Sequence, residues 1–247
     1  MMFALHMPDH TLTAELSWAA AAAVAIVAVI GLVRRREKSA RPSIALFAAV
    51  TALLFAVQMV NFPLLDGRTS GHILGAAAAV LLLGPAFGVL AMALVLVVQA
   101  IAMGDGGVAA LGANILNMAI LAPAAAMITA NFVRQRRSDA MGTIVAAALA
   151  GWVGTVVAAL ACAAELAASG VGSFASLATA LVGHHAMLGF VEAAFTVAVV
   201  VPTLLPAANG RRVQIASLAV AAAVVFALTP VSSELPDTLE VVLPEQR

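Results

Sequence analysis

The chain has 247 residues, of which 64% are hydrophobic and 10% charged, with a mean hydropathy of +1.09. Its twelve basic and twelve acidic residues cancel, so the net charge does not indicate a nucleic-acid partner. The high apolar content argues against a soluble domain of this size. Apolar segments long enough to cross a bilayer instead predict an all-α polytopic membrane protein. The single Cys162 excludes an internal disulfide and any multi-cysteine metal site.

Residues 1–16 precede the first apolar segment and contain acid and histidine but no lysine or arginine, unlike the start of a signal peptide. We therefore expect a retained first span that follows an extracytoplasmic N-terminal segment. Gly84-Pro85 breaks helical geometry, so a short third segment should meet the fourth at a tight turn. The apolar segments run at approximately 17–33, 43–63, 72–83, 86–103, 112–133, 141–168, 186–206 and 213–229.

The basic residues test this count of eight spans. They cluster after the first, fifth and seventh segments, at Arg34, Arg35, Arg36, Lys38, Arg41, Arg134, Arg136, Arg137, Arg211 and Arg212. With eight spans and an outside N-terminus, all of these face the cytoplasm, and only Arg68 and Arg247 lie outside. The positive-inside rule thus favours eight transmembrane helices over seven or nine, with both termini extracytoplasmic.

Two histidines lie in short stretches that this topology places outside, beside the ends of different spans. Pro8 fixes the backbone just after His6, and Asp9 could orient an imidazole through its second nitrogen. His72 ends the stretch Thr69-Ser70-Gly71-His72, in which Ser70 or Thr69 could cap the third span. These features suggest a metal site, although a single outer-loop histidine is more often incidental.

Further polar residues lie within or beside the apolar segments. Asn114 and Asn117 are one helical turn apart and share a face, where they either bond between helices or support a site. Glu192 lies two turns after His185, and an intramembrane glutamate is costly unless it is paired. We expect His184, His185 and Glu192 to form an outward-facing polar network.

Three blocks of this sequence resemble the CbiM/NikM group, the substrate-binding membrane components of energy-coupling factor (ECF) cobalt and nickel importers. A fourth and looser block runs from His185 to Thr196 and includes Glu192. The three blocks are His6-Met7-Pro8-Asp9, Asn61-Phe62-Pro63 with Thr69-Ser70-Gly71-His72, and Gly104-Asp105-Gly106-Gly107 with Leu111-Gly112-Ala113-Asn114-Ile115-Leu116-Asn117-Met118-Ala119.

The resemblance implies a nearly planar four-nitrogen site for Ni(II) or Co(II), carried as transported substrate. Its members begin Met-His, and the ligands are the terminal amine, the histidine's deprotonated amide nitrogen and ring, and a second histidine. Here His6 and His72 would be these two histidines; strong in-plane nitrogen donors suit Ni(II). The residues that would support them are Asp9, Ser70, Asp105, Asn114, Asn117 and Glu192, with His10 and His185 as auxiliary candidates.

The sequence departs from this pattern at its start, because Met1-Met2-Phe3-Ala4 and Leu5 precede His6. One explanation is a start codon at position 5 that is decoded as Met. Trimming of the first four residues is a second explanation, and a different ligand set, with His10 assisting, is a third. The metal itself stays open, since planar nitrogen coordination accepts both nickel and cobalt.

No Gly-x-x-x-x-Gly-Lys-Ser/Thr motif occurs, so we expect a transport subunit rather than an enzyme. The resemblance implies two ATPase subunits and a transmembrane coupling protein as partners, in the cytoplasmic membrane of a bacterium or archaeon. It also implies three parts: the metal-binding segment 1–16, a seven-span core at 17–212, and an accessory eighth span at 213–247. The tail of this last part resembles Pro-Asp-Gly-Leu-Glu, with Thr238 in place of the glycine.

The main alternative is a stand-alone secondary nickel/cobalt permease driven by the membrane potential. Such permeases carry His-x-x-x-x-Asp-His within a helix, and the nearest match here, residues 6–10, has the wrong spacing and precedes the first span. An intramembrane hydrolase is a more distant alternative, because the chain has no His-Glu-x-x-His motif.

Overall fold

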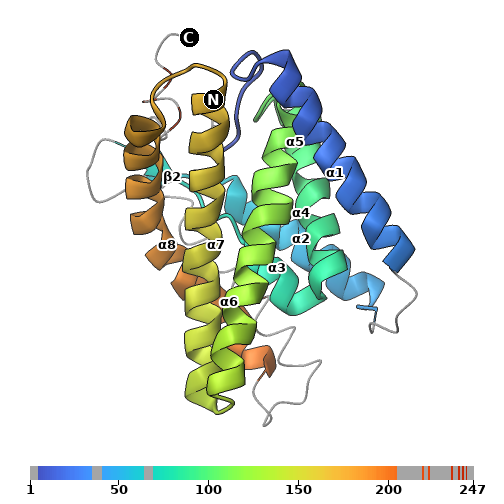
Figure 1. Ribbon diagram of the computed structural model, residues 1–247. Coiled ribbons are helices and arrows are strands. Elements are labelled where there is room, and N and C mark those ends of the chain that lie inside the picture. Colours follow the sequence, from blue (N-terminus) through green and yellow to red (C-terminus); the bar gives the residue numbers. More distant parts are fainter. Residues whose placement is uncertain are drawn as a thin grey trace.

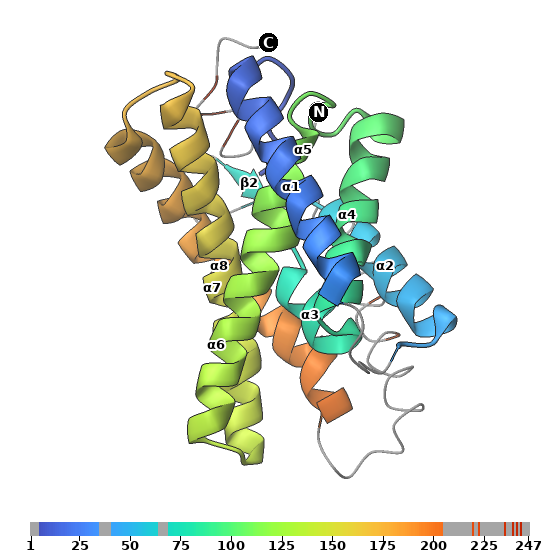
Figure 2. The same cartoon turned by 45° about the vertical axis from the view of Figure 1, so that its right-hand side comes forward.

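Helices make up nearly all of the described structure (Figures 1 and 2). The computed structural model describes residues 5–34, 41–63 and 69–204, with isolated positions 219, 222, 235, 239, 241 and 243. Two π-helical stretches, η1 (Gln99–Met103) and η2 (Ile115–Leu121), continue α4 and join α5 to α6. The α-helices are α1 (Ala14–Arg34), α2 (Ile44–Gln58), α3 (Ala76–Leu83), α4 (Pro85–Val98), α5 (Leu111–Asn114), α6 (Ala122–Arg136), α7 (Ala140–Ala168) and α8 (Phe174–Leu204).

Within the described residues, five helical stretches are long and apolar enough to cross a membrane, which confirms the predicted all-α polytopic class. They are Ala14–Gly31, Pro85–Met103, Leu111–Arg136, Ala140–Ala168 and Phe174–Thr203. The predicted eighth span at 213–229 lies outside the described residues apart from positions 219 and 222. The count of eight therefore stays a prediction.

The predicted start of the seventh segment is wrong, because α8 begins at Phe174 rather than near position 186. His184 and His185 lower the local hydropathy, so the hydropathy pattern placed the start of the apolar run after them. Alanines and leucines on both sides of the two histidines nevertheless continue one helix. Both histidines thus lie inside α8 and not in a loop before it.

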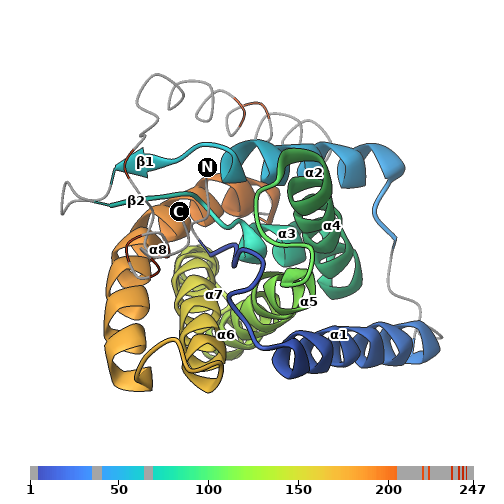
Figure 3. The same cartoon turned by 90° about the horizontal axis from the view of Figure 1, so that it is seen from above.

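Small residues let the long helices approach closely. A Cβ added at Gly151 of α7 would lie 2.8 Å from the Thr196 hydroxyl and 2.9 Å from the Glu192 carbonyl oxygen of α8. The helix α1 is different, because only 6% of its apolar stretch Ala14–Gly31 is buried, against 39–44% of the apolar stretches of the other four spans. Seen from above, α1 lies at the edge of the bundle (Figure 3).

The short helix α3 is buried and meets α4 at the turn that the sequence predicted. Gly84 has φ 78°, a left-handed value that favours glycine, and Pro85 is the first residue of α4. Gly88 then packs so closely on α3 that an added Cβ would lie 2.7 Å from the Val80 Cα. The close contact leaves α3 inside the bundle, beneath the segment that carries His72.

A short hairpin replaces the end of the predicted second segment. The helix α2 ends at Gln58, and β1 (Phe62–Pro63) pairs antiparallel with β2 (Ser70–Gly71), placing Phe62 opposite Gly71. Residues 72–75 then run without helical structure to α3. The hairpin therefore places His72 in the interior of the bundle, as the first residue of the non-helical link 72–75.

The two ends of α7 show which features share a side of the bundle. Its 29 residues, at about 1.5 Å each, separate its ends by about 40 Å. At the first end Asp139 caps the helix and pairs with Arg137 at 2.9 Å. At the other end the Thr13 N–H donates to the Ser169 hydroxyl at 3.2 Å. The N-terminal segment thus lies at the opposite end of the bundle from the arginines at the C-terminal end of α6.

Candidate metal site

His6 and His72 meet inside the bundle although they are far apart in the chain. Their ring centroids are 5.3 Å apart, with the ring planes at 40°. The side chains are only 1% and 3% exposed. In the view from above, the segment that starts the described chain runs into the middle of the ring of helices, close to β2 (Figure 3).

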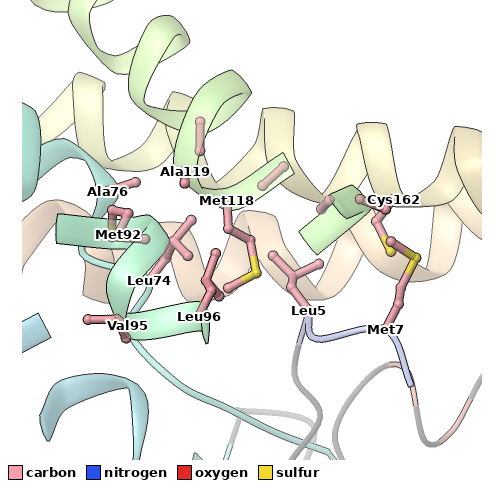
Figure 4. Packing of buried hydrophobic residues seen from close by; sticks show 14 of the residues in the cluster. Leu5, Met7, Leu74, Ala76, Met92, Val95, Leu96, Met118, Ala119 and Cys162 are labelled. Carbon is pink, nitrogen blue, oxygen red and sulfur yellow. The ribbon is translucent and has the colours of Figure 1, made fainter. Parts of the chain in front are cut away.

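Asn114 holds the segment that carries His6. The Met7 N–H donates to Asn114 Oδ1 at 2.9 Å, and Asn114 Nδ2 donates back to the Met7 carbonyl at 3.1 Å. The Gly107 N–H donates to the same carbonyl at 2.8 Å. The side chains of Leu5 and Met7 are buried in the main core, with the Met7 sulfur beside Cys162 (Figure 4). Both the backbone and the side chains thus fix this segment.

The loop between η1 and α5 gives the segment room because two of its residues are glycines. A Cβ added at Gly107 would overlap the backbone and carboxylate of Asp9. One added at Gly106, where φ is 87°, would lie 3.2 Å from the His6 Cβ. The Asp9 Oδ1 accepts from the Ala109 N–H at 2.7 Å, which fastens the loop to the segment.

Asp105 is the carboxylate that lies beside His6. Its Oδ2 is 3.1 Å from His6 Nδ1, close enough for an ion pair but without hydrogen-bond geometry. Both ring nitrogens of His6 and both oxygens of Asp105 lack hydrogen-bond partners within the described part of the chain. The prediction that Asp9 would orient an imidazole is therefore wrong, since Asp9 bonds to Ala109 and Asp105 occupies that place.

His72 presents one nitrogen as a hydrogen-bond donor and leaves the other unpartnered. Its Nδ1 lies 3.2 Å from the Ile73 carbonyl, which can only accept, so Nδ1 carries the proton. Its Nε2 has no partner among the described residues. Burial, with His6 nearby, lowers the pKa of His72 to about 4. At neutral pH the imidazole is uncharged, and Nε2 has a lone pair available for a metal.

Glu192 and Gln58 hold the link that follows His72. The two oxygens of Glu192 accept from the Leu74 and Gly75 N–H groups, each at 2.8 Å. Gln58 Nε2 donates to the Leu74 carbonyl at 2.8 Å. The sequence pointed to Glu192 but not to Gln58, whose only signal was an amide within the second apolar segment.

Ser70 does not cap the third helix, and that prediction is wrong. Its hydroxyl donates to the Leu235 carbonyl at 2.6 Å. The residue before α3 is Gly75 with φ 74°, and no side chain caps the helix there. Leu239 is buried in the same core cluster as Leu5, so described positions of the C-terminal part contact the side of the bundle that holds the histidines.

The remaining candidates have hydrogen-bond partners or surroundings other than the His6 and His72 rings. Asn117 Nδ2 donates to Glu165 Oε2 at 2.6 Å, which joins η2 to α7. The Nδ1 atoms of His184 and His185 lie 2.7 Å from carbonyls one turn back in α8. His10 is exposed in a turn with φ 67°. The structure thus joins Asn117 to Glu165 and leaves His10 exposed, while His185 is close enough to His72 to contribute to lowering the pKa of His72.

The arrangement supplies two buried imidazoles that have ring nitrogens without hydrogen bonds, but no complete side-chain cage. Among the described residues, no three His, Cys, Asp or Glu side chains are grouped so that they could hold a metal ion. Further donors for a four-coordinate ion would therefore have to come from the backbone or from outside the described part. Neutral imidazole is a good ligand for nickel, copper and zinc.

Comparison with known proteins supports a role in metal transport. Residues 6–207 match a family described as the cobalt uptake substrate-specific transmembrane region, CbiM. A protein of Archaeoglobus fulgidus, named as a fused nickel transport protein, is 37% identical over 79% of this chain and 64% of its own length. The fused nickel transport protein of Rhodobacter capsulatus is 36% identical over 65% of this chain and 46% of its own length. The chain thus spans less than two thirds of either fused protein.

One further sequence and one solved structure match over more of their own length. A protein of Haloquadratum walsbyi, named as a metal transport protein, is 35% identical over 79% of this chain and 88% of its own length. The crystal structure of a truncated transition metal transporter matches with a TM-score of 0.68 and 28% identity, over 78% of this chain and 94% of that one. The chain is therefore a multi-pass protein of the prokaryotic cell membrane that belongs to the CbiM family of cobalt-uptake substrate-specific proteins.

Proposed function

We propose that this chain is the metal-capturing subunit of an ATP-driven ECF importer for Ni(II), Co(II) or both. His6 and His72 are the ligating side chains. The observation that carries the proposal is that two buried imidazoles meet at 5.3 Å, and that His6 Nδ1, His6 Nε2 and His72 Nε2 have no hydrogen-bond partner among the described residues. Buried polar atoms normally have partners, so unpartnered nitrogens that converge on one place favour a ligand.

The remaining ligands are nitrogen atoms of the N-terminal segment. If the mature chain begins at position 5, its free amine lies next to His6, and amine and amide nitrogens close a five-membered chelate ring. The His6 amide and ring nitrogen close a six-membered ring, and His72 Nε2 completes a planar set suited to Ni(II). Asn114 supports this geometry because it holds Met7, the next residue.

The topology supports capture from outside the cell. The two histidines lie at the end of the bundle opposite Arg134, Arg136 and Arg137, and the positive-inside rule assigns those arginines to the cytoplasm. The chain has no phosphate-binding Walker motif, so ATP hydrolysis would belong to partner ATPases that act through a coupling protein.

The purified chain tests this function. We expect it to bind Ni(II) or Co(II) in an equilibrium titration, to hydrolyse no ATP, and to sustain uptake into sealed vesicles only with its partner subunits. Potential-driven accumulation by the chain alone would instead establish the permease alternative. Failure to bind either metal would contradict both transport mechanisms.

A further inference from the structure

The link between His72 and α3 contains two consecutive peptide groups whose polar atoms are all bonded to side chains. One peptide group joins Ile73 to Leu74, and the next joins Leu74 to Gly75. A peptide group is planar and trans, so its carbonyl and N–H point in opposite directions, and fixing one end fixes the other. Bonds to both ends therefore hold each peptide plane firmly.

The first peptide group connects His72 to Glu192. The Ile73 carbonyl accepts from His72 Nδ1 at 3.2 Å, and the Leu74 N–H of the same plane donates to Glu192 Oε2 at 2.8 Å. A carboxylate on one side of an amide polarises it and makes the carbonyl on the other side a stronger acceptor. Glu192 thus reaches the His72 ring through a single peptide unit.

The second peptide group is held from two helices. Its Gly75 N–H donates to Glu192 Oε1 at 2.8 Å, and its Leu74 carbonyl accepts from Gln58 Nε2 at 2.8 Å. Gln58 ends α2 and Glu192 lies in α8, and both side chains are at most 1% exposed. Side chains of α2 and α8 therefore hold the second peptide group by hydrogen bonds at its two opposite ends.

We infer that Glu192, assisted by Gln58, sets the tautomer and orientation of His72 through these two peptide groups, so that Nε2 faces the metal. Metal-ligating histidines commonly donate their other N–H to a carbonyl or carboxylate, which fixes the ring and raises its basicity. Here the carbonyl belongs to the peptide group that Glu192 holds. Glu192 is thus a positioning residue. The effect on metal affinity rests on the proposed function, whereas the effect on the tautomer does not.

The cost of burying Glu192 supports a dedicated role. No lysine or arginine occurs in α8, so no cation from its own helix offsets the burial of a carboxylate within the membrane. Its two backbone hydrogen bonds go to the link that carries His72. An apolar residue at this position would avoid the cost of burial but would leave two buried N–H groups unpaired.

We call this action of Glu192 and Gln58 on His72 through the two peptide groups the relay. Three variants of the full chain test it. Glu192→Gln turns an amide NH₂ toward a backbone N–H, because an amide has only one acceptor oxygen. Gln58→Met removes the donor to the Leu74 carbonyl at similar volume. Thr196→Val is the matched control: Thr196 is buried one turn beyond Glu192, and its hydroxyl has no partner among the described residues.

Two measurements separate a relay from a general loss of structure. The first is the tautomer of His72 in the metal-free protein, read from ¹⁵N chemical shifts of labelled histidine and assigned by comparison with His72→Ala. The second is the dissociation constant for Ni(II) and for Co(II). We expect Glu192→Gln to lose the single Nδ1–H tautomer and to bind about 10–100-fold more weakly. Gln58→Met should show the same changes to a smaller extent, and Thr196→Val should show neither.

A wild-type tautomer in Glu192→Gln would overturn the relay, whatever happened to the affinity. If that variant does not fold, Gln58→Met decides, and an unchanged tautomer and affinity in it would likewise overturn the relay. If the wild-type chain binds neither metal while the tautomer changes as expected in the variants, the relay stands and the proposed function fails.

Discussion

The pair His6 and His72 and the pair His184 and His185 differ in where their ring nitrogens bond. In α8, the Nδ1 atoms of the second pair bond to carbonyls one helical turn back, each at 2.7 Å. His6 and His72 lie outside helices, and between them three ring nitrogens have no hydrogen-bond partner in the described structure. His185 is as buried as His72, so burial alone does not distinguish a ligand from a structural histidine.

The reason for this difference is local backbone geometry. A histidine inside a helix always has a carbonyl one turn back within reach, as a serine or threonine does. A histidine in an extended segment has no such carbonyl and depends on whatever other segments bring to it. Histidines at the ends of links between spans are therefore better ligand candidates than histidines within spans.

The largest effect should come from removing a ring that has an unpartnered nitrogen. We expect His72→Ala to weaken Ni(II) and Co(II) binding by more than about a hundredfold, beyond the usual cost of losing an outer partner. His184→Ala is the control, because its ring bonds within its own helix, and it should bind like wild type. Competition titration of both purified variants measures this. Wild-type affinity in His72→Ala would remove the distinction between the two pairs.

The next effect concerns the start of the chain. Leu5, the residue before His6, is buried in the core. We expect the intact mass of the native protein to show a chain that begins at position 5, read as Met. A version forced to retain Met1 should bind Ni(II) far more weakly, because its amine is displaced from His6. Tight binding by a native chain that retains Met1 would instead make His10 or Asp9 the source of the missing ligand.

The pH dependence of binding checks which nitrogen is the ligand. A terminal amine has a pKa near 7.7–8.0 and must lose its proton to bind, so amine-dependent affinity should fall as pH decreases below about 8. The pKa of His72 is about 4, so protons compete for this imidazole only near that pH. The chain that begins at position 5 should therefore lose affinity between pH 8 and pH 6. A flat profile over that range would exclude the amine as a ligand.

The smallest effect should come from crowding the loop beside His6. Gly107→Ala would press a methyl group against Asp9, and such overpacking costs about 1–3 kcal/mol. We expect a lower melting temperature and weaker metal binding as the N-terminal segment shifts. The control is Gly183→Ala in α8, where a Cβ meets nothing within 4 Å and alanine favours the helix. Equal melting temperatures and affinities for the two variants would mean that the loop does not hold the segment.

Much of the fold could be predicted from local patterns. Apolar segments predicted the long helices, and Gly84-Pro85 predicted the turn between α3 and α4. The errors arose where a local pattern was ambiguous. His184 and His185 interrupted the hydropathy of α8 without interrupting its helix, and Ser70 looked like a cap but bonds to Leu235.

The pairing of His6 with His72 was predicted from a family resemblance rather than from spacing, and the structure brings the two rings together. Asp9, the residue directly after Pro8, was the carboxylate expected to orient an imidazole, because it is near His6 in the chain. The structure places Asp105 there instead. Gln58 was not predicted at all, because nothing in its neighbours shows that its amide faces Leu74.

The sequence by itself determined that the chain crosses the membrane and where its helices break, and it predicted that the arginines gather on one side. These features depend on hydropathy and on backbone preferences, which act over a few residues. Only the tertiary structure decided which polar groups meet: Met7 with Asn114, and Glu192 with the peptide groups after His72. Such contacts join residues more than a hundred positions apart, so they depend on how the helices pack, which no short stretch of sequence encodes.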